Sequence, residues 1–136
     1  MRPYMITQVT HMTLFVHDQN EALEFYTQKL GFKLHTDAPF GTDRWLTICP
    51  TAQPDFEIYL ALATTPEQKA LVGKQGDTIP LFCLATDDCL KAYESFTRNG
   101  VTIAHKPEQH PWGISAVVKD MAGNLINVTQ VHSRAQ

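Results

Sequence analysis

One pattern of structural signals occurs twice along this 136-residue chain, and the repeat constrains the fold more than any other feature. Each copy begins with a short apolar strand that ends near an aspartate, continues as an amphipathic helix, and passes a glycine into a second strand. The helix caps Asp18 and Asp88 are 70 residues apart, and the glycines Gly31 and Gly100 are 69 residues apart. Such a constant offset predicts a single βαβββ unit used twice.

The first strand of the first unit alternates in character, which predicts that its two faces differ. One face carries only apolar side chains, those of Met12, Leu14 and Val16. The other face carries both polar and apolar side chains, those of His11, Thr13 and Phe15. Asp18 then caps a helix with Glu21 at the capping-box position, and Gly31 suits a left-handed C-terminal cap. We expect further strands over residues 32–36, 44–49 and 56–62, separated by gaps that carry Pro39, Gly41, Pro50 and Pro54.

The second unit repeats this order. We expect a helix that begins after Asp88, a turn over residues 120–124, and strands over residues 81–86, 101–104, 114–119 and 125–131. Residues 105–110 form a loop in this interpretation, with a histidine at each end, His105 and His110. In the connector, Thr65, Pro66 and Gln68 predict a short capped helix. The expected organisation is one domain over residues 1–136, with module one at 6–63, the connector at 64–79 and module two at 80–131.

This order of elements predicts an α+β protein in which each unit forms a curved mixed sheet with one face buried under its helix. The other face of the first sheet carries Phe15, Trp45 and Tyr59 if the alternation holds. These three rings make that face too aromatic for contact with water alone. Two curved sheets that enclose a cup-shaped cavity would explain them, and such cavities bind small molecules.

Composition excludes several classes of partner. The net charge of −3 and the scattered Lys and Arg residues argue against a nucleic-acid partner, and the sequence has no apolar stretch of membrane-spanning length. Residues 1–6 lack the apolar run and cleavage site of a secretory signal. Cys49, Cys83 and Cys89 have no metal-type spacing, and their odd number favours reduced thiols. We therefore expect a cytoplasmic protein.

The motifs together resemble a known family. The segments that carry the resemblance are 11–18, 22–32, 86–88 leading to 99–101, 111–113, and the turn 120–124, in which Met121 replaces a usual proline. They are similar to the vicinal oxygen chelate superfamily of glyoxalases, bleomycin-resistance proteins and dioxygenases. The resemblance covers roughly residues 6–130. It implies two βαβββ modules and, in many members, a metal held by four strand positions.

Those four positions fall here on His11, Tyr59, Leu81 and Asn127, with Glu57 two residues from Tyr59 on the same face. Divalent transition metals prefer histidine, carboxylate and thiolate ligands. Leu81 supplies none of these, and Asn127 is a weak neutral ligand. The resemblance therefore implies a member with an incomplete metal site, and we expect no cofactor. A divalent metal held weakly by His11 and Glu57 is the alternative.

The candidate site residues are those expected to face the cavity. His11 and Glu57 are the candidates for acid–base catalysis, and for each of them an ordinary structural role remains open. Loop and surface positions are expected for His17 and His35. The predicted ligand-binding set is His11, Thr13, Phe15, Trp45, Glu57, Tyr59, Leu81, Cys83, Trp112, Asn127 and Thr129.

The sequence favours a protein that binds an amphipathic or aromatic small molecule without a metal, as the bleomycin-resistance members do. The alternative function is a metal-dependent lyase, isomerase or dioxygenase of the same superfamily that uses His11 and Glu57. A homodimer is implied by the resemblance alone.

Overall fold

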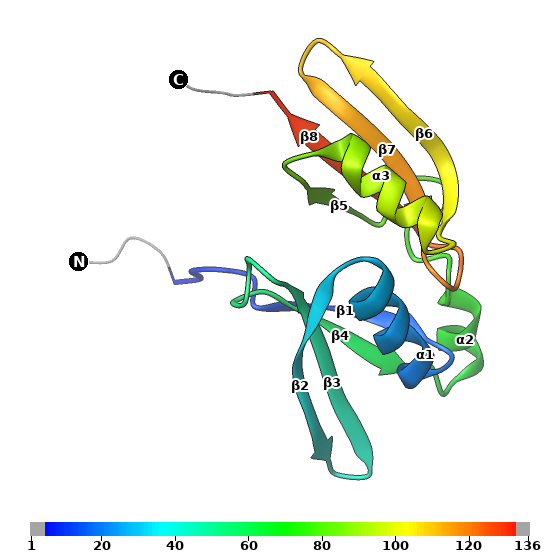
Figure 1. Ribbon diagram of the computed structural model, residues 1–136. Coiled ribbons are helices and arrows are strands. Elements are labelled where there is room, and N and C mark those ends of the chain that lie inside the picture. Colours follow the sequence, from blue (N-terminus) through cyan, green and yellow to red (C-terminus); the bar gives the residue numbers. More distant parts are fainter. Residues whose placement is uncertain (1–4, 133–136) are drawn as a thin grey trace.

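The computed structural model describes residues 5–132 and contains two four-stranded mixed sheets, each with its own helix (Figure 1). The first sheet has the order β1-β4-β3-β2, and the second has the order β5-β8-β7-β6. The strands β1 and β4 run parallel in the first sheet, as do β5 and β8 in the second sheet. All other neighbouring strands in the two sheets are antiparallel. The predicted α+β class with two similar units is confirmed.

The elements have the following bounds. The strands are β1 His11–Val16, β2 Phe32–Phe40, β3 Asp43–Pro50, β4 Glu57–Leu62, β5 Phe82–Ala85, β6 Thr102–His110, β7 Gly113–Lys119 and β8 Leu125–Val131. The helices are α1 Gln19–Glu24, which continues as the π-helical segment η1 Phe25–Lys29, then α2 Pro66–Leu71 and α3 Cys89–Arg98. Within the described residues, no helix is both long and apolar enough to cross a membrane.

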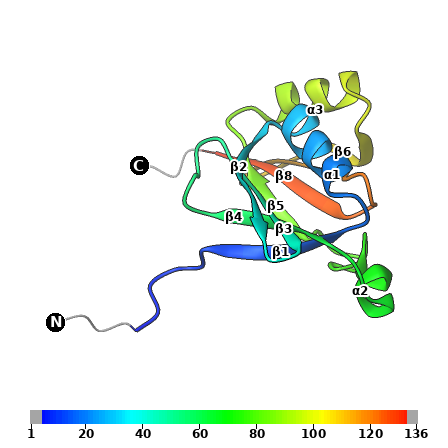
Figure 2. The same ribbon diagram turned by 90° about the horizontal axis from the view of Figure 1, so that it is seen from below.

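The predicted helix caps are confirmed. The Asp18 carboxylate accepts a hydrogen bond of 3.0 Å from the Glu21 N–H, and Asp88 accepts one of the same length from Lys91. These bonds satisfy backbone donors that the first helical turn would otherwise leave unpaired. In the connector, Thr65 and Gln68 form a reciprocal capping box at the start of α2. This short helix lies beside the end of β1 (Figure 2).

Three prolines correct the predicted strand boundaries. The sequence predicts Pro39 and Pro50 in gaps and residues 105–110 in a loop, whereas Pro50 is the last residue of β3. β2 continues to Phe40, and β6 continues through Pro107 to His110. Both strands lie at the edge of their sheet, where a missing backbone N–H costs no ladder bond if it faces outward. Register shifts in both strands accommodate the irregular backbone.

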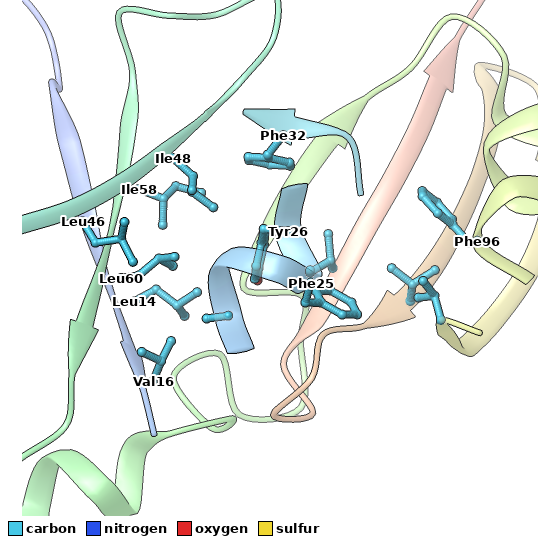
Figure 3. Packing of buried hydrophobic residues seen from close by; sticks show 14 of the residues in the cluster. Leu14, Val16, Phe25, Tyr26, Phe32, Leu46, Ile48, Ile58, Leu60 and Phe96 are labelled. Atoms are coloured by element: carbon cyan, nitrogen blue, oxygen red, sulfur yellow. The ribbon is translucent and has the colours of Figure 1, made fainter. Parts of the chain in front are cut away.

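The main core lies between the first sheet and its helix and extends to the second unit (Figure 3). Leu14 and Val16 of β1 are fully buried, which confirms the predicted alternation of that strand. The helical residues Phe25 and Tyr26 pack over this face, and Phe96 of α3 joins the same cluster from the second unit. The helix-covered faces of both sheets therefore contribute to one main core, and a smaller separate cluster of Cys89, Ile114 and Ala116 lies in the second unit. In the part of the chain that the structure describes, the opposite faces of the sheets carry no helix.

A buried polar contact joins the two units inside this core. The Tyr26 hydroxyl, on η1, donates a hydrogen bond of 2.8 Å to Asp120, in the turn between β7 and β8. Asp120 also accepts hydrogen bonds from the backbone of Ala122 and from the backbone and side chain of Asn124. Burial, together with the nearby Asp120 carboxylate, raises the pKa of Tyr26 well above its ordinary value.

Candidate functional site

The open face of the first sheet carries a ladder of three rings from three strands. Trp45 of β3 stacks on Tyr59 of β4 with 4.4 Å between ring centroids, and His11 of β1 meets Trp45 edge-on at 5.3 Å. Strand register places the three side chains on one face, because His11 pairs with Glu57, and Thr47, two residues from Trp45, pairs with Tyr59. Three residues that we predicted for the site thus lie together, and hereafter we call them the aromatic ladder.

A polar cluster lies beside the ladder on the same face. The Thr47 hydroxyl donates a hydrogen bond of 2.7 Å to Glu57, and His35 Nδ1 lies 3.2 Å from the same Glu57 oxygen. His35 is at the surface as expected, but the register shift between Leu34 and Thr36 also brings its ring to Glu57. The sequence gives no signal for this contact, because a bulge of this kind interrupts simple alternation.

A cavity of about 420 Å³ adjoins the ladder at the ends of β1 and β4. Its wall combines Thr13, Phe15 and Tyr59 from the predicted set with further polar residues that the sequence does not predict. The Gln19 side chain holds part of this wall in place, since its Nε2 donates to the carbonyl oxygens of Leu60 at 2.8 Å and Arg44 at 3.3 Å. The lining residues are Thr13, Phe15, Gln19, Thr42, Asp43, Arg44, Tyr59, Ala61, Leu62, Thr64 and Gln68.

The outer edge of β1 is held by a side chain from the connector. Gln75 accepts a hydrogen bond of 2.7 Å from the Phe15 N–H and donates one of 3.1 Å to the Thr13 carbonyl. One amide group therefore reproduces both bonds that a neighbouring strand would make. Because Thr13 and Phe15 line the cavity, Gln75 also fixes the backbone of its wall.

The remaining predicted residues lie in the second unit. Cys83 and Asn127 are register partners on β5 and β8, and the Thr129 hydroxyl donates to the Asn127 side-chain oxygen. Trp112 lies at the turn between β6 and β7, where its indole stacks on His110 at 4.7 Å. The ring contacts of Trp112 are thus made within its own hairpin.

Leu81 and Cys83 lie close to the junction of the units. Leu81 is partly buried and packs against the main core cluster. Cys83 is exposed and lines a separate apolar pocket of about 240 Å³ together with Met12, Phe32, Pro50, Gln53, Phe56, Ile58, Phe82 and Leu84.

The donor set on the open faces does not fit a resident divalent metal. Among residues 5–132, no three His, Cys, Asp or Glu side chains lie close enough together to hold an ion. Glu57 is already engaged by Thr47 and His35, and the Asn127 oxygen accepts from Thr129. A transition metal needs three or four such ligands, so the described residues offer too few.

Comparisons with known proteins agree with this fold. The profile of the Glyoxalase/Bleomycin resistance protein/Dioxygenase superfamily matches residues 8–128. Protein YurT of Bacillus subtilis (strain 168) is 36% identical over 120 residues, which span 87% of this chain and 94% of that protein. The crystal structure of UcmS2 has a TM-score of 0.81 at 32% identity, covering 92% of this chain and 98% of that chain. TnmS3, an antibiotic binding protein from Streptomyces sp. CB03234, has a TM-score of 0.79 at 29% identity, covering 94% and 98%.

Proposed function

Because the chain belongs to the Glyoxalase/Bleomycin resistance protein/Dioxygenase superfamily, we propose that it binds and sequesters a flat, partly aromatic small molecule without a metal. The aromatic ladder beside a cavity of about 420 Å³ is the observation that carries this proposal. The similarity to TnmS3, an antibiotic binding protein, supports a small organic ligand. The cavity volume falls within the range of about 300–1,000 Å³ that is typical of small-molecule sites.

The ladder suits a flat ligand because its rings already hold each other in place. Trp45 is fixed between Tyr59 and His11, so stacking of a ligand on it costs little additional side-chain entropy. Offset or edge-to-face ring contacts contribute about 0.5–1.5 kcal/mol beyond the area that they bury. Polar side chains in the adjoining cavity then orient the ligand.

A homodimer is part of this proposal. The open face of the first sheet is aromatic, whereas that of the second sheet offers polar groups at Asn127 and Thr129. A second copy that places its second sheet over the ladder would enclose the ligand on both sides. Sedimentation equilibrium at micromolar concentration should give twice the chain mass, and a monomer that still binds ligand would contradict this part.

The binding proposal is tested with 4-nitroanisole, a neutral flat probe, by isothermal titration calorimetry. Replacing Trp45 with leucine should weaken binding by about tenfold or more, because about 1.4 kcal/mol of lost stacking and contact corresponds to a factor of ten. The matched control is Trp112→Leu, which removes the other tryptophan and should leave the affinity within twofold. Equal affinities in wild-type protein and Trp45→Leu would refute the role of the ladder.

The pair formed by Glu57 and His35 favours one alternative, a lyase, isomerase or dioxygenase of the same superfamily. A carboxylate 3.2 Å from an imidazole is an arrangement suited to proton transfer. In the metal-dependent form of this alternative, His11 and Glu57 would hold an ion completed by the substrate. Elemental analysis of the purified protein distinguishes the two functions, since about one Zn, Ni, Mn or Fe per chain would support the enzyme.

A further inference from the structure

The cavity beside the ladder differs from the ladder in its chemistry, and this difference indicates what the far end of the ligand carries. Apart from two rings and two aliphatic side chains, its wall is built from hydroxyl, amide and carboxylate side chains and the guanidinium of Arg44. We infer that the cavity binds a hydroxylated ring that bears an amine, the chemistry of an amino sugar, attached to the flat group held by the ladder. The inference rests on the proposed function, because it extends the same ligand into the neighbouring cavity.

The wall is held in a fixed geometry before any ligand arrives. Gln19 bonds to the backbone of both β3 and β4, and it thereby joins the two strands at the cavity. Gln68 accepts a hydrogen bond of 2.9 Å from the Thr64 N–H, so its amide oxygen is engaged and its amino group is the part that offers hydrogen bonds. A polar site that is arranged in advance loses little entropy when it binds neutral hydroxyl groups.

The charges around the cavity favour an amine over an anion. Arg44 lines the cavity, but its guanidinium makes two hydrogen bonds of 2.9 Å to Asp37 and one of 2.8 Å to Asn20. Its positive charge is therefore largely offset by Asp37. The neighbouring Asp43 carboxylate also lines the cavity, and within residues 5–132 it makes no ion pair. Asp43 is thus the carboxylate that a ligand amine would meet.

The two rings of the wall complete the match to a sugar. Phe15 and Tyr59 line the same cavity as three residues that carry hydroxyl groups, Thr13, Thr42 and Thr64. A pyranose presents an apolar C–H face and a rim of hydroxyl groups, and it needs both kinds of contact at once. A purely apolar tail would leave the polar groups of this wall without partners and would lose their hydrogen bonds to water.

Four probes that share one flat group test the inference by calorimetry. They are 4-nitroanisole and the β-D-glucoside, β-D-glucosaminide and β-D-glucuronide of 4-nitrophenol. We expect the glucoside to bind about tenfold more tightly than 4-nitroanisole, since two or three net hydrogen bonds are gained. The glucosaminide should bind about two- to fivefold more tightly still, as expected for one solvent-exposed charge pair, and the glucuronide should bind more weakly than the glucoside.

Variants assign the effect to the cavity. Asp43→Asn should abolish the preference for the glucosaminide over the glucoside. Thr42→Val should weaken the binding of the glucoside and of the glucosaminide. The effect is expected for the probes that carry a sugar. Asp55→Asn, which changes an exposed aspartate in the loop before β4, is the matched charge control and should have no effect.

The outcomes separate this inference from the proposed function. If 4-nitroanisole binds through Trp45 but none of the glycosides binds more tightly, the inference is overturned and the proposed function stands. An unchanged glucosaminide preference in Asp43→Asn would likewise overturn the assignment of the amine. If none of the four probes binds, both the inference and the proposed function are refuted.

Discussion

Replacing Tyr26 with phenylalanine tests whether one hydroxyl group stabilises the junction between the two units. The substitution keeps the aromatic ring in the core and deletes the hydrogen bond of 2.8 Å to Asp120. Asp120 is only 5% exposed, so water cannot easily replace the lost donor. Three donors from Ala122 and Asn124 remain on the carboxylate, and they limit the damage to a single bond.

A hydrogen bond to a charged group contributes about 1.5–3 kcal/mol to stability, and removal of one partner leaves the other desolvated. We therefore expect Tyr26→Phe to lower the free energy of unfolding by about 2 kcal/mol at pH 7. Urea denaturation followed by far-ultraviolet circular dichroism measures this difference, and the slope of the transition should not change. The control is Tyr93→Phe on α3, a partly exposed tyrosine, which should cost less than about 0.5 kcal/mol.

The same pair predicts how stability changes at alkaline pH. The pKa of Tyr26 is raised in the folded protein by burial and then by Asp120, whereas in the unfolded chain it is near 10.0, the ordinary value for tyrosine. The folded state therefore retains the proton to higher pH, and this stabilising contribution is complete below pH 10.0. Above that pH it falls by up to about 1.4 kcal/mol per unit, until Tyr26 ionises in the folded protein as well.

The stability difference between wild-type protein and Tyr26→Phe should accordingly be constant from pH 7 to 9 and shrink above pH 10.0. Because the two proteins share all other titratable groups, the contributions of those groups cancel in the difference between the two free energies of unfolding. The reasoning is refuted if the two variants Tyr26→Phe and Tyr93→Phe cost the same at pH 7. A difference that grows with pH would show that the sign of the argument is wrong.

Three further substitutions test the supports of the site and of the helices. Gln75→Ala removes both side-chain bonds at the edge of β1, so we expect urea denaturation to show a loss of about 1–3 kcal/mol together with weaker probe binding. Gly73 has a φ of +79°, and Gly73→Ala would place a Cβ 2.1 Å from the Ala122 backbone oxygen, so it should lower the free energy of unfolding by more than about 2 kcal/mol. Gly31 has a similar φ of +82° but open space around it. Gly31→Ala should therefore lower the free energy of unfolding by only about 1–2 kcal/mol in the same assay. Asp88→Ala removes the cap of α3, and thermal unfolding should show a loss of about 1 kcal/mol that Asp88→Asn largely restores.

The overall fold was accessible from the sequence because its signals are local. Asp18 and Gly31 mark the ends of one helix, and period-two alternation assigns Leu14 to the core and Phe15 to the open face. Strand ends were less accessible, since Pro39 ends a strand by propensity but is tolerated at an edge.

The site was predictable only in its centre. Trp45 and Tyr59 meet because strand register brings them together, and register follows from alternation. Apart from Thr13, the polar wall could not be predicted, because it is assembled from five separate stretches of the chain. Gln75 lies in a polar loop with no periodicity, and its contact with β1 depends on how the connector folds back. Such contacts are properties of the tertiary structure.

The edge strands described above carry features that oppose the addition of a strand from another molecule. An exposed strand edge can template the addition of a strand from another molecule, which is the first step toward amyloid-like growth. Here the amide of Gln75 occupies the edge of β1, and Pro39 and Pro107 interrupt the outer donors of β2 and β6. These features disfavour strand addition from another copy at these three edges.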